Sequence, residues 1–313
     1  MFAAPHFQDH TKAREYLERL RWAGEPVCAH CGTIGGHYET KKPGVWRCSS
    51  KDCRKDFSVT TKTVMESSHI KLNIWLQAFA LMTASKKGMS AHQIHRQLGV
   101  TYKSAWFLVM RIREAMRTGG LTPPMGGAGK VVEADETYFG DIPEAKRRPS
   151  PQRRGRPYTK GGRSGAGGKR TIVSLVERGG SVRSFHVPTS DAATVATIVR
   201  ENIHRETRLH TDESRLYPVV GREFAAHETV NHSAKEYARG DVTTNSVEGY
   251  FSIFKRGMRG VYQHCSEKHL HRYLAEFDFR FNHRTALGFN DGDRAALALK
   301  GIEGKRLTYR LPH

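Results

Sequence analysis

The amino-acid sequence predicts a multidomain α/β protein, in which two small N-terminal domains precede a larger domain of strands and helices. Three observations support this prediction. Four of the five cysteines crowd into residues 28–53, apolar residues then recur at helical spacing between Leu72 and Met116, and strand-like segments begin at Val131. A chain of 313 residues is also too long for one ordinary core, because single cores stop growing at roughly 250–300 residues.

The first predicted domain, residues 1–65, joins a short helix to a cysteine cluster. Apolar residues within Asp9–Arg21 share one helical face. The cysteines follow as C-x2-C, sixteen residues and C-x4-C: Cys28, Cys31, Cys48 and Cys53. Such pairs can close a tetrahedral thiolate site for structural Zn²⁺, which leaves no open position for a substrate. The alternatives are a set of buried free thiols, or His30 or His37 in place of one cysteine; Cys265 stands apart as a packed or surface thiol.

The second predicted domain, residues 66–118, is helical. Ser90 is a candidate N-cap, Gly99 breaks the helix that follows, and another helix begins after Thr101. A short glycine-containing turn between two helices is typical of a helix-turn-helix. The second helix of the pair begins with Tyr102, Lys103 and Ser104, which could contact base edges. Further along the same helix, Arg111 could contact a phosphate. A three-helix bundle with a solvated basic face has the same periodicity and is the alternative.

A linker rich in Gly and Pro, residues 119–130, leads into the larger domain at residues 131–285. We expect these elements in chain order: strands Val131–Phe139, Thr171–Glu177 and Val182–Val187, a helix Ala192–Ile203, a strand Arg208–Thr211 and a helical segment from Thr243. A basic insertion, residues 141–170, interrupts the strands where a hairpin loop would lie. It offers Arg153, Arg154 and Arg156 to a phosphate backbone, or else is a soluble insertion without a partner. Residues 286–313 form a C-terminal extension.

Charge and hydropathy narrow the class of partner. Lys and Arg number 51 against 31 Asp and Glu, which leaves a formal charge of +20 and a pI near 10.0. Such an excess favours a polyanion bound through its phosphates, and a membrane surface is the rival interpretation. Because no run of 18 apolar residues and no secretory signal occurs, we expect a cytoplasmic protein without a membrane partner.

Three acids stand where strand ends and a helix start would converge on one edge of a sheet. Asp135 lies in an apolar strand, Asp212 follows a strand, and Glu248 comes 35 residues later near a helix start. Carboxylates so arranged suit Mg²⁺, and a pair of such ions can clamp the attacking and leaving oxygens of a phosphodiester. Lys255 returns to the face of Glu248 after about two helical turns. Three further acids lie near: Glu136 and Asp141 could compete as ligands, and Glu133 shares a strand face with Asp135.

Three sequence blocks around these acids carry a family resemblance: Asp135–Gly140, His210–Asp212 and Asn245–Arg256. They resemble the catalytic blocks of DDE transposases from bacterial insertion sequences, and in particular the ISXO-type group, which has an N-terminal zinc ribbon. The resemblance extends from the ribbon through the helix at Lys268–Phe277 to Asn282. It implies that the larger domain is a ribonuclease-H-like catalytic domain, with a mixed sheet flanked by helices.

The resemblance also implies an activity, cofactors and partners. The enzyme would bind the terminal inverted repeats of an insertion sequence, cleave strands and join the 3′ ends to target DNA. Two Mg²⁺ ions, which Mn²⁺ could replace, would be held by Asp135, Asp212 and Glu248, with Lys255 as the basic partner and Arg256 on DNA. Asn245 is a second candidate for the third position, since relatives use Asn as well as Glu. Double-stranded DNA, as transposon ends and target, would be bound by a homodimer or higher oligomer on the bacterial chromosome.

Two other functions fit parts of the pattern. A transcription regulator with a ribbon and a helix-turn-helix would explain the charge and the cysteines but needs no acids. Such a regulator would keep all DNA-dependent activity after Asp135→Ala and Asp212→Ala. A structure-specific, Mg²⁺-dependent nuclease would cut DNA but never join a 3′ end to a target, so a strand-transfer assay separates it from a transposase.

Overall fold

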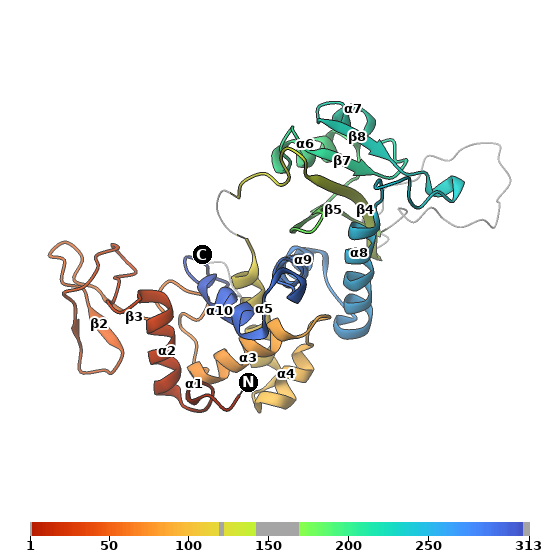
Figure 1. The fold of residues 1–313 in the computed structure, drawn as a ribbon. Helices are drawn as coiled ribbons and strands as arrows, with labels where there is room; N and C mark the ends of the chain where they lie inside the picture. Colours follow the sequence, from red (N-terminus) through yellow and green to blue (C-terminus); the bar gives the residue numbers. More distant parts are fainter. Residues whose placement is uncertain (1, 119–121, 142–168, 309–313) are drawn as a thin grey trace. The chain divides into compact units, whose positions relative to one another are not determined.

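The computed structural model describes residues 2–118, 122–141 and 169–308. These residues fall into two compact units, Met1–Thr118 with Ala275–His313, and Gly119–Leu274 (Figure 1). The predicted C-terminal extension, residues 286–313, therefore belongs to the same unit as the ribbon and the N-terminal helices. Within the described residues, no helix is both long and apolar enough to cross a membrane.

The first unit is mainly helical. Its helices are α1 (Pro5–Gln8), α2 (His10–Trp22), α3 (Leu72–Ala84), α4 (Ala91–Leu98), α5 (Tyr102–Met116), the second half of α9 (Glu267–Asn282) and α10 (Asp291–Lys300). The predicted caps form: the Ser90 side chain accepts from the amide of Gln93, and the Thr101 side chain accepts from the amide of Ser104. Gly99 ends α4 at a φ of 65°, a left-handed conformation that glycine adopts without strain. The sequence therefore predicted the α4–turn–α5 element correctly.

One apolar core joins the parts of this unit. Trp75 of α3 and Leu108 of α5 are completely buried, and the core also includes Phe57 from the ribbon and Leu299 from α10. Helix α10 packs on α3 and α5. The sequence predicted three separate segments here: a ribbon, a helical domain and a C-terminal extension. They share buried apolar surface, which explains why they form one unit.

The ribbon holds a small antiparallel sheet in the order β1 (Tyr38–Glu39), β2 (Val45–Arg47) and β3 (Asp56–Ser58). Two of the predicted ligands, Cys28 and Cys48, are buried beside it. Strands of two or three residues bury little apolar surface. A sheet this small depends on a further constraint, such as a metal, to hold its loops together.

The second unit contains a five-stranded sheet in the order β6-β5-β4-β7-β8. The strands are β4 (Val131–Asp141), β5 (Lys169–Glu177), β6 (Val182–Val187), β7 (Arg208–Thr211) and β8 (Ala226–Thr229). Strands β4, β5 and β6 pair antiparallel, whereas β7 and β8 run parallel to β4. This mixed order, with a helix between β6 and β7, confirms the predicted ribonuclease-H-like fold. The chain order also matches the predicted series of strands and helices.

Helices cover both faces of the sheet. The helical elements of this unit are α6 (Ala192–Asn202), α7 (Pro218–Gly221), the 3-10 turn η2 (His232–Ala234), α8 (Asn245–Gly257), the π-helical turn η3 (Met258–Tyr262) and the first half of α9. The 3-10 turn η4 (Thr285–Leu287) lies in the first unit. On β4, Val132 and Ala134 join the apolar core that α6 and α7 share, while the intervening Glu133 contacts α8. The period of two along β4 therefore divides its side chains between two helical layers.

Candidate active site

Two of the predicted acids meet at the edge of the sheet where β7 ends. Strand β7 pairs in parallel with Val131–Glu133 of β4, and Asp212 follows β7 directly. Continuing that register brings Asp212 beside Asp135. Carboxylate oxygens of Asp135, Glu136 and Asp212 all lie within 4.8 Å of one another. The structure thus joins the predicted pair to Glu136, which the sequence indicated only as a competing ligand.

Burial and mutual repulsion dominate the electrostatics of this cluster. Burial, and then the nearby Asp212 and Glu136 carboxylates, raise the pKa of Asp135 well above its usual range. Burial raises the pKa of Glu136 to about 7 and also raises the pKa of Asp212. One buried oxygen of Glu136 has no hydrogen-bond donor among the described residues. A group of hard oxygen donors with excess negative charge and an unused acceptor fits a divalent cation.

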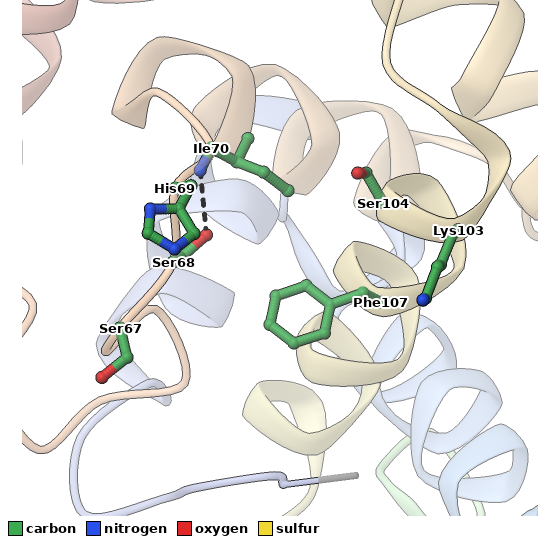
Figure 2. Close-up of a pocket in the computed structure, with 7 residues that line it drawn as sticks. All are labelled: Ser67, Ser68, His69, Ile70, Lys103, Ser104 and Phe107. Atoms are coloured by element: carbon green, nitrogen blue, oxygen red, sulfur yellow. Dashed lines mark hydrogen bonds between the residues drawn. The ribbon is translucent and has the colours of Figure 1, made fainter.

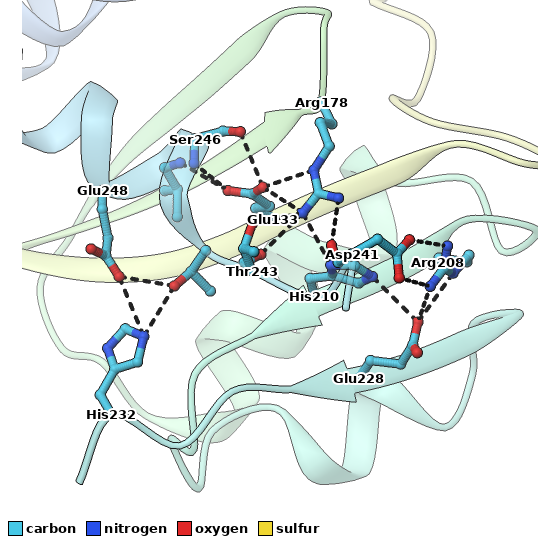
Figure 3. Close-up of polar contacts among 12 residues, drawn as sticks. Glu133, Arg178, Arg208, His210, Glu228, His232, Asp241, Thr243, Ser246 and Glu248 are labelled. Carbon is cyan, nitrogen blue, oxygen red and sulfur yellow. Dashed lines mark hydrogen bonds and ion pairs between the residues drawn. The ribbon is translucent and has the colours of Figure 1, made fainter. Parts of the chain in front are cut away.

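Glu248 and Lys255 approach this cluster from helix α8. Glu248 adds to the repulsion that raises the pKa of Asp135, although it is the smallest of the causes. Its side chain is 44% exposed, and one carboxylate oxygen accepts from the Thr244 hydroxyl at 2.9 Å and lies 3.4 Å from Nε2 of His232 (Figure 3). Burial lowers the pKa of Lys255, and the charge of Asp135 opposes that shift, so Lys255 lies near the acids. Asn245 is exposed at the first residue of α8.

Glu133 is a site residue whose role the sequence did not reveal. Its side chain is completely buried, and it accepts hydrogen bonds from the backbone amides of Ser246 and Val247 at 2.7 and 3.1 Å. Arg178 donates to the other oxygen at 2.9 Å (Figure 3). The available signal was an acid on the same face of an apolar strand as Asp135. That signal could equally indicate a second metal ligand or an acid that only stabilises the fold.

The four predicted zinc ligands gather in the ribbon. The thiols of Cys28, Cys31, Cys48 and Cys53 lie within 4.8 Å of one another. Sulfur–sulfur distances are 3.8 Å for Cys28 to Cys53 and 3.5 Å for Cys31 to Cys48. A tetrahedral site with Zn–S bonds of about 2.3 Å requires sulfurs about 3.8 Å apart, so the donor set fits Zn²⁺.

Neither nearby histidine is needed as a zinc ligand. Nε2 of His30 contacts the backbone oxygen of Asp56 at 3.2 Å. His37 contacts the backbone oxygen of Thr33 at 3.0 Å and accepts from the amide of Ser49 at 3.1 Å. Both rings are therefore engaged with the protein backbone, and the four cysteines alone complete the tetrahedron.

The start of α5 presents the predicted base-contacting residues at the surface. Tyr102 is 45% exposed and stacks on the ring of His92, with centroids 4.2 Å apart, and Lys103 is exposed. Ser104 is half-buried, and its hydroxyl accepts from Thr101. A cavity of about 310 Å³ opens beside them (Figure 2); it is lined by Ser67, Ser68, His69, Ile70, Lys103, Ser104 and Phe107. This end of α5 is open to a partner.

The prediction that Arg111 contacts DNA is contradicted. The Arg111 side chain is buried, with 6% of the residue exposed, and donates to the backbone oxygens of Val64 and Glu66. Arg113, two residues further along α5, is 1% exposed and donates to the buried carboxylate of Glu276 at 2.6 Å. Both arginines satisfy buried acceptors, so neither can reach a phosphate. The sequence cannot show this, because their partners are distant along the chain.

The remaining predicted DNA contacts divide into two groups. Arg256 is exposed on α8, one residue beyond Lys255, and its Nε donates to the backbone oxygen of Ser252. Its guanidinium is therefore available at the surface of the second unit. The arginines of the basic insertion, Arg153, Arg154 and Arg156, lie outside the described residues.

Comparisons with known proteins agree with this arrangement. The ISXO2-like transposase domain matches residues 126–282, and the transposase zinc-ribbon domain matches residues 8–56. An uncharacterised protein in transposable element ISH50 of Halobacterium salinarum is 28% identical over 285 residues, which cover 88% of this chain and 91% of that protein. An uncharacterised transposase-like protein of Haemophilus influenzae is 28% identical over 96 residues, covering 31% of this chain and 76% of that protein.

A solved structure was also matched, the Mos1 transposase in a paired-end complex with the left transposon end. It shares 16% sequence identity, with a TM-score of 0.31, over 73% of this chain and 74% of that chain. The family assignment does not depend on this match. Because the transposase domain model covers half of the sequence and the zinc-ribbon model covers the cysteine cluster, the chain belongs to the ISXO2-like transposase family.

Proposed function

We propose that this DDE transposase holds Mg²⁺ at Asp135 and Asp212 and uses it to cut and rejoin DNA strands. The proposal rests on one observation, the meeting of the Asp135, Glu136 and Asp212 carboxylates within 4.8 Å at the end of β7. Three half-buried carboxylates at this distance repel one another when ionised, and a divalent cation relieves that repulsion. Hard oxygen ligands favour Mg²⁺ or Mn²⁺ over the thiophilic metals that suit the ribbon.

The surrounding residues have separate parts in this chemistry. Bound Mg²⁺ supplies activation of the attacking water or 3′-hydroxyl and stabilisation of the leaving oxygen. Asp135 and Asp212 bind the metal through their carboxylates, and Glu248 takes the third position from the first turn of α8. Lys255, two turns further along the helix, neutralises a phosphate beside the acids. Asn245 is the second candidate for the third position, because it also lies in the first turn of α8.

The partner we propose is double-stranded DNA, as transposon ends and as target. The formal charge of +20 favours a polyanion. Tyr102 and Lys103 at the exposed start of α5 offer contacts to base edges, and Arg256 offers a contact to the backbone. We further propose that a homodimer or larger assembly brings two transposon ends together, and that it works on the chromosome in the cytoplasm.

The test is a strand cleavage and strand-transfer assay with labelled DNA that carries the terminal repeats of the element. Asp135→Asn and Asp212→Asn should abolish both reactions while leaving DNA binding and the unfolding temperature near those of the wild type. Asp241→Asn is the matched control, because the exposed side chain of Asp241 pairs with Arg208 at the surface, and Asn keeps the backbone oxygen that accepts from Arg178. Full activity of either site variant would refute the proposal. Cleavage by the wild type without joining would show a nuclease instead.

Calorimetric titration with Mn²⁺ separates the two candidates for the third position. Glu248→Gln should weaken Mn²⁺ binding, because it removes a charged ligand of the cluster, and Asn245→Ala should leave the affinity unchanged. The reverse result would assign the third position to Asn245.

A further inference from the structure

Helix α8, which carries Glu248, begins without a cap of its own. Its N-cap residue, Thr244, makes no capping hydrogen bond with its side chain. The first amides of a helix have no partner within the helix and carry partial positive charge. Because α8 packs on the sheet through β4 and β5, these amides need an acceptor supplied by another element.

Glu133 of β4 supplies that acceptor. One oxygen accepts from the amides of Ser246 and Val247, and the other accepts from the Ser246 hydroxyl at 3.0 Å. The side chain is completely buried. A buried carboxylate is costly unless its acceptors are filled, and the amides and hydroxyl of α8 fill them. Glu133 therefore holds the first turn of α8 against the strand.

Arg178 extends this clamp to the segment that leads into α8. Its guanidinium donates to Glu133 from Nε at 3.1 Å and from Nη2 at 2.9 Å. The same group donates to the backbone oxygen of Asp241 at 2.7 Å and to the Thr243 hydroxyl at 3.0 Å (Figure 3). Strand β4, the loop from Asp241 to Thr243 and the start of α8 thus share one set of hydrogen bonds around a single carboxylate.

We infer that Glu133 is a positioning residue for the metal site. It lies two residues before Asp135 on β4, and the amides that it holds lie one and two residues before Glu248 on α8. The clamp therefore sets the separation between two acids that come from different elements. The inference rests on the proposed function, since it assigns to Glu133 the task of placing Glu248 for the metal.

The test is Mn²⁺ affinity measured by calorimetry on the full-length protein, with strand cleavage as a second readout. Glu133→Gln keeps the size of the side chain but puts an amide group against donors. We expect a Mn²⁺ affinity about 10- to 100-fold lower, the range found when residues that orient metal ligands are changed. Ser246→Ala removes one of the hydrogen bonds and should give a smaller loss, which keeps the test usable if Glu133→Gln does not fold.

A matched control and a double variant separate positioning from general stability. Val199→Ala shortens a buried side chain of α6 in the same unit and should lower the unfolding temperature without changing Mn²⁺ affinity. If Glu133 acts through Glu248, then Glu133→Gln should have little further effect on Mn²⁺ affinity in a Glu248→Gln background. Independent losses in the double variant would overturn the inference.

The outcomes also distinguish this inference from the proposed function. Wild-type Mn²⁺ affinity in both Glu133→Gln and Ser246→Ala, alongside loss in Asp135→Asn, would overturn only the role of Glu133. Wild-type affinity and activity in Asp135→Asn would overturn the proposed metal site itself, and the inference with it.

Discussion

Glu276 is completely buried between two arginines in the first unit, and its replacement by Gln should strongly destabilise the protein. Its carboxylate accepts from Arg113, which is 1% exposed, at 2.6 Å, and from Arg280, whose side chain is 5% exposed. Glu276→Gln preserves the shape of the side chain and removes the negative charge. Two buried guanidinium groups then lose their common counterion.

The expected loss follows from the balance of two electrostatic effects. At an effective dielectric constant of about 20, each close ion pair contributes roughly 4 kcal/mol of attraction, so the two pairs contribute about 8 kcal/mol. Removing the charge of Glu276 also relieves a desolvation cost of several kcal/mol. The net loss in the free energy of unfolding should be about 3–5 kcal/mol, as found when one member of a buried pair is removed.

Urea unfolding followed by circular dichroism measures this loss. Glu15→Gln is the control, because it breaks an exposed pair with Lys12, which should contribute less than about 1 kcal/mol. A triple variant, Arg113→Met with Glu276→Leu and Arg280→Met, should recover most of the stability, since an apolar cluster of similar volume can replace a buried ion cluster. A loss for Glu276→Gln no larger than that for Glu15→Gln would refute the reasoning.

Three further predictions concern the ribbon, the DNA surface and an acid-sensitive cap. Cys48→Ser should reduce bound zinc, measured by mass spectrometry, from about one ion per chain, and should unfold the ribbon as chelators unfold zinc domains; unchanged zinc content would contradict the site. Arg256→Ala should lower the salt dependence of DNA binding by about one phosphate contact; Arg111→Ala should leave that slope unchanged and lower stability. Hydrogen bonds from Thr194 hold the pKa of Asp191 below its usual value. The contribution of Asp191 to stability should therefore be complete above the pKa that it has in the unfolded chain, and should be lost as the pH falls through its pKa in the folded protein. In thermal melts, Asp191→Asn should reduce the fall of the unfolding temperature at acid pH.

Local signals in the sequence predicted the elements of the fold well. Ser90, Gly99 and Thr101 mark helix ends because capping depends on the residues next to each terminus. The β-prone segment Thr171–Glu177 predicted a strand, and the structure extends it by two residues to Lys169. Each of these features depends on interactions between residues close together in the chain.

Long-range partners could not be predicted in the same way. The apolar face of α10 indicates that this helix is buried, but its period cannot say that α3 and α5 are the partners. Arg113 is of a residue type that is mostly exposed, yet it is buried against an acceptor, Glu276, that is 163 residues away. The pattern of charges along one helix shows which residues the helix carries. It does not show which groups of other elements pack against them.

The metal cluster was predictable only in part for the same reason. Predicted strands indicated Asp135 and Asp212, and a predicted helix start and its period indicated Glu248 and Lys255. The clamp by Glu133 depends on a contact with Ser246, 113 residues away. The strand period places Glu133 on the face of Asp135, yet Glu136 is the acid that joins Asp135 and Asp212 in the structure.

The groups around each carboxylate distinguish the acids of β4 that serve chemistry from the one that serves structure. Glu133 receives hydrogen bonds from two amides, a hydroxyl and a guanidinium, so its charge is compensated within the protein. Asp135, two residues later, accepts from the amide of Glu136 and faces Asp212, Glu136 and, more weakly, Glu248, with Lys255 as the nearby cation. A cluster of acids with so little compensation is typical of a site that binds a cation. Both are acids on the same face of one strand, and the difference in compensation supports the proposal that Asp135 binds the metal while Glu133 holds the helix that completes the site.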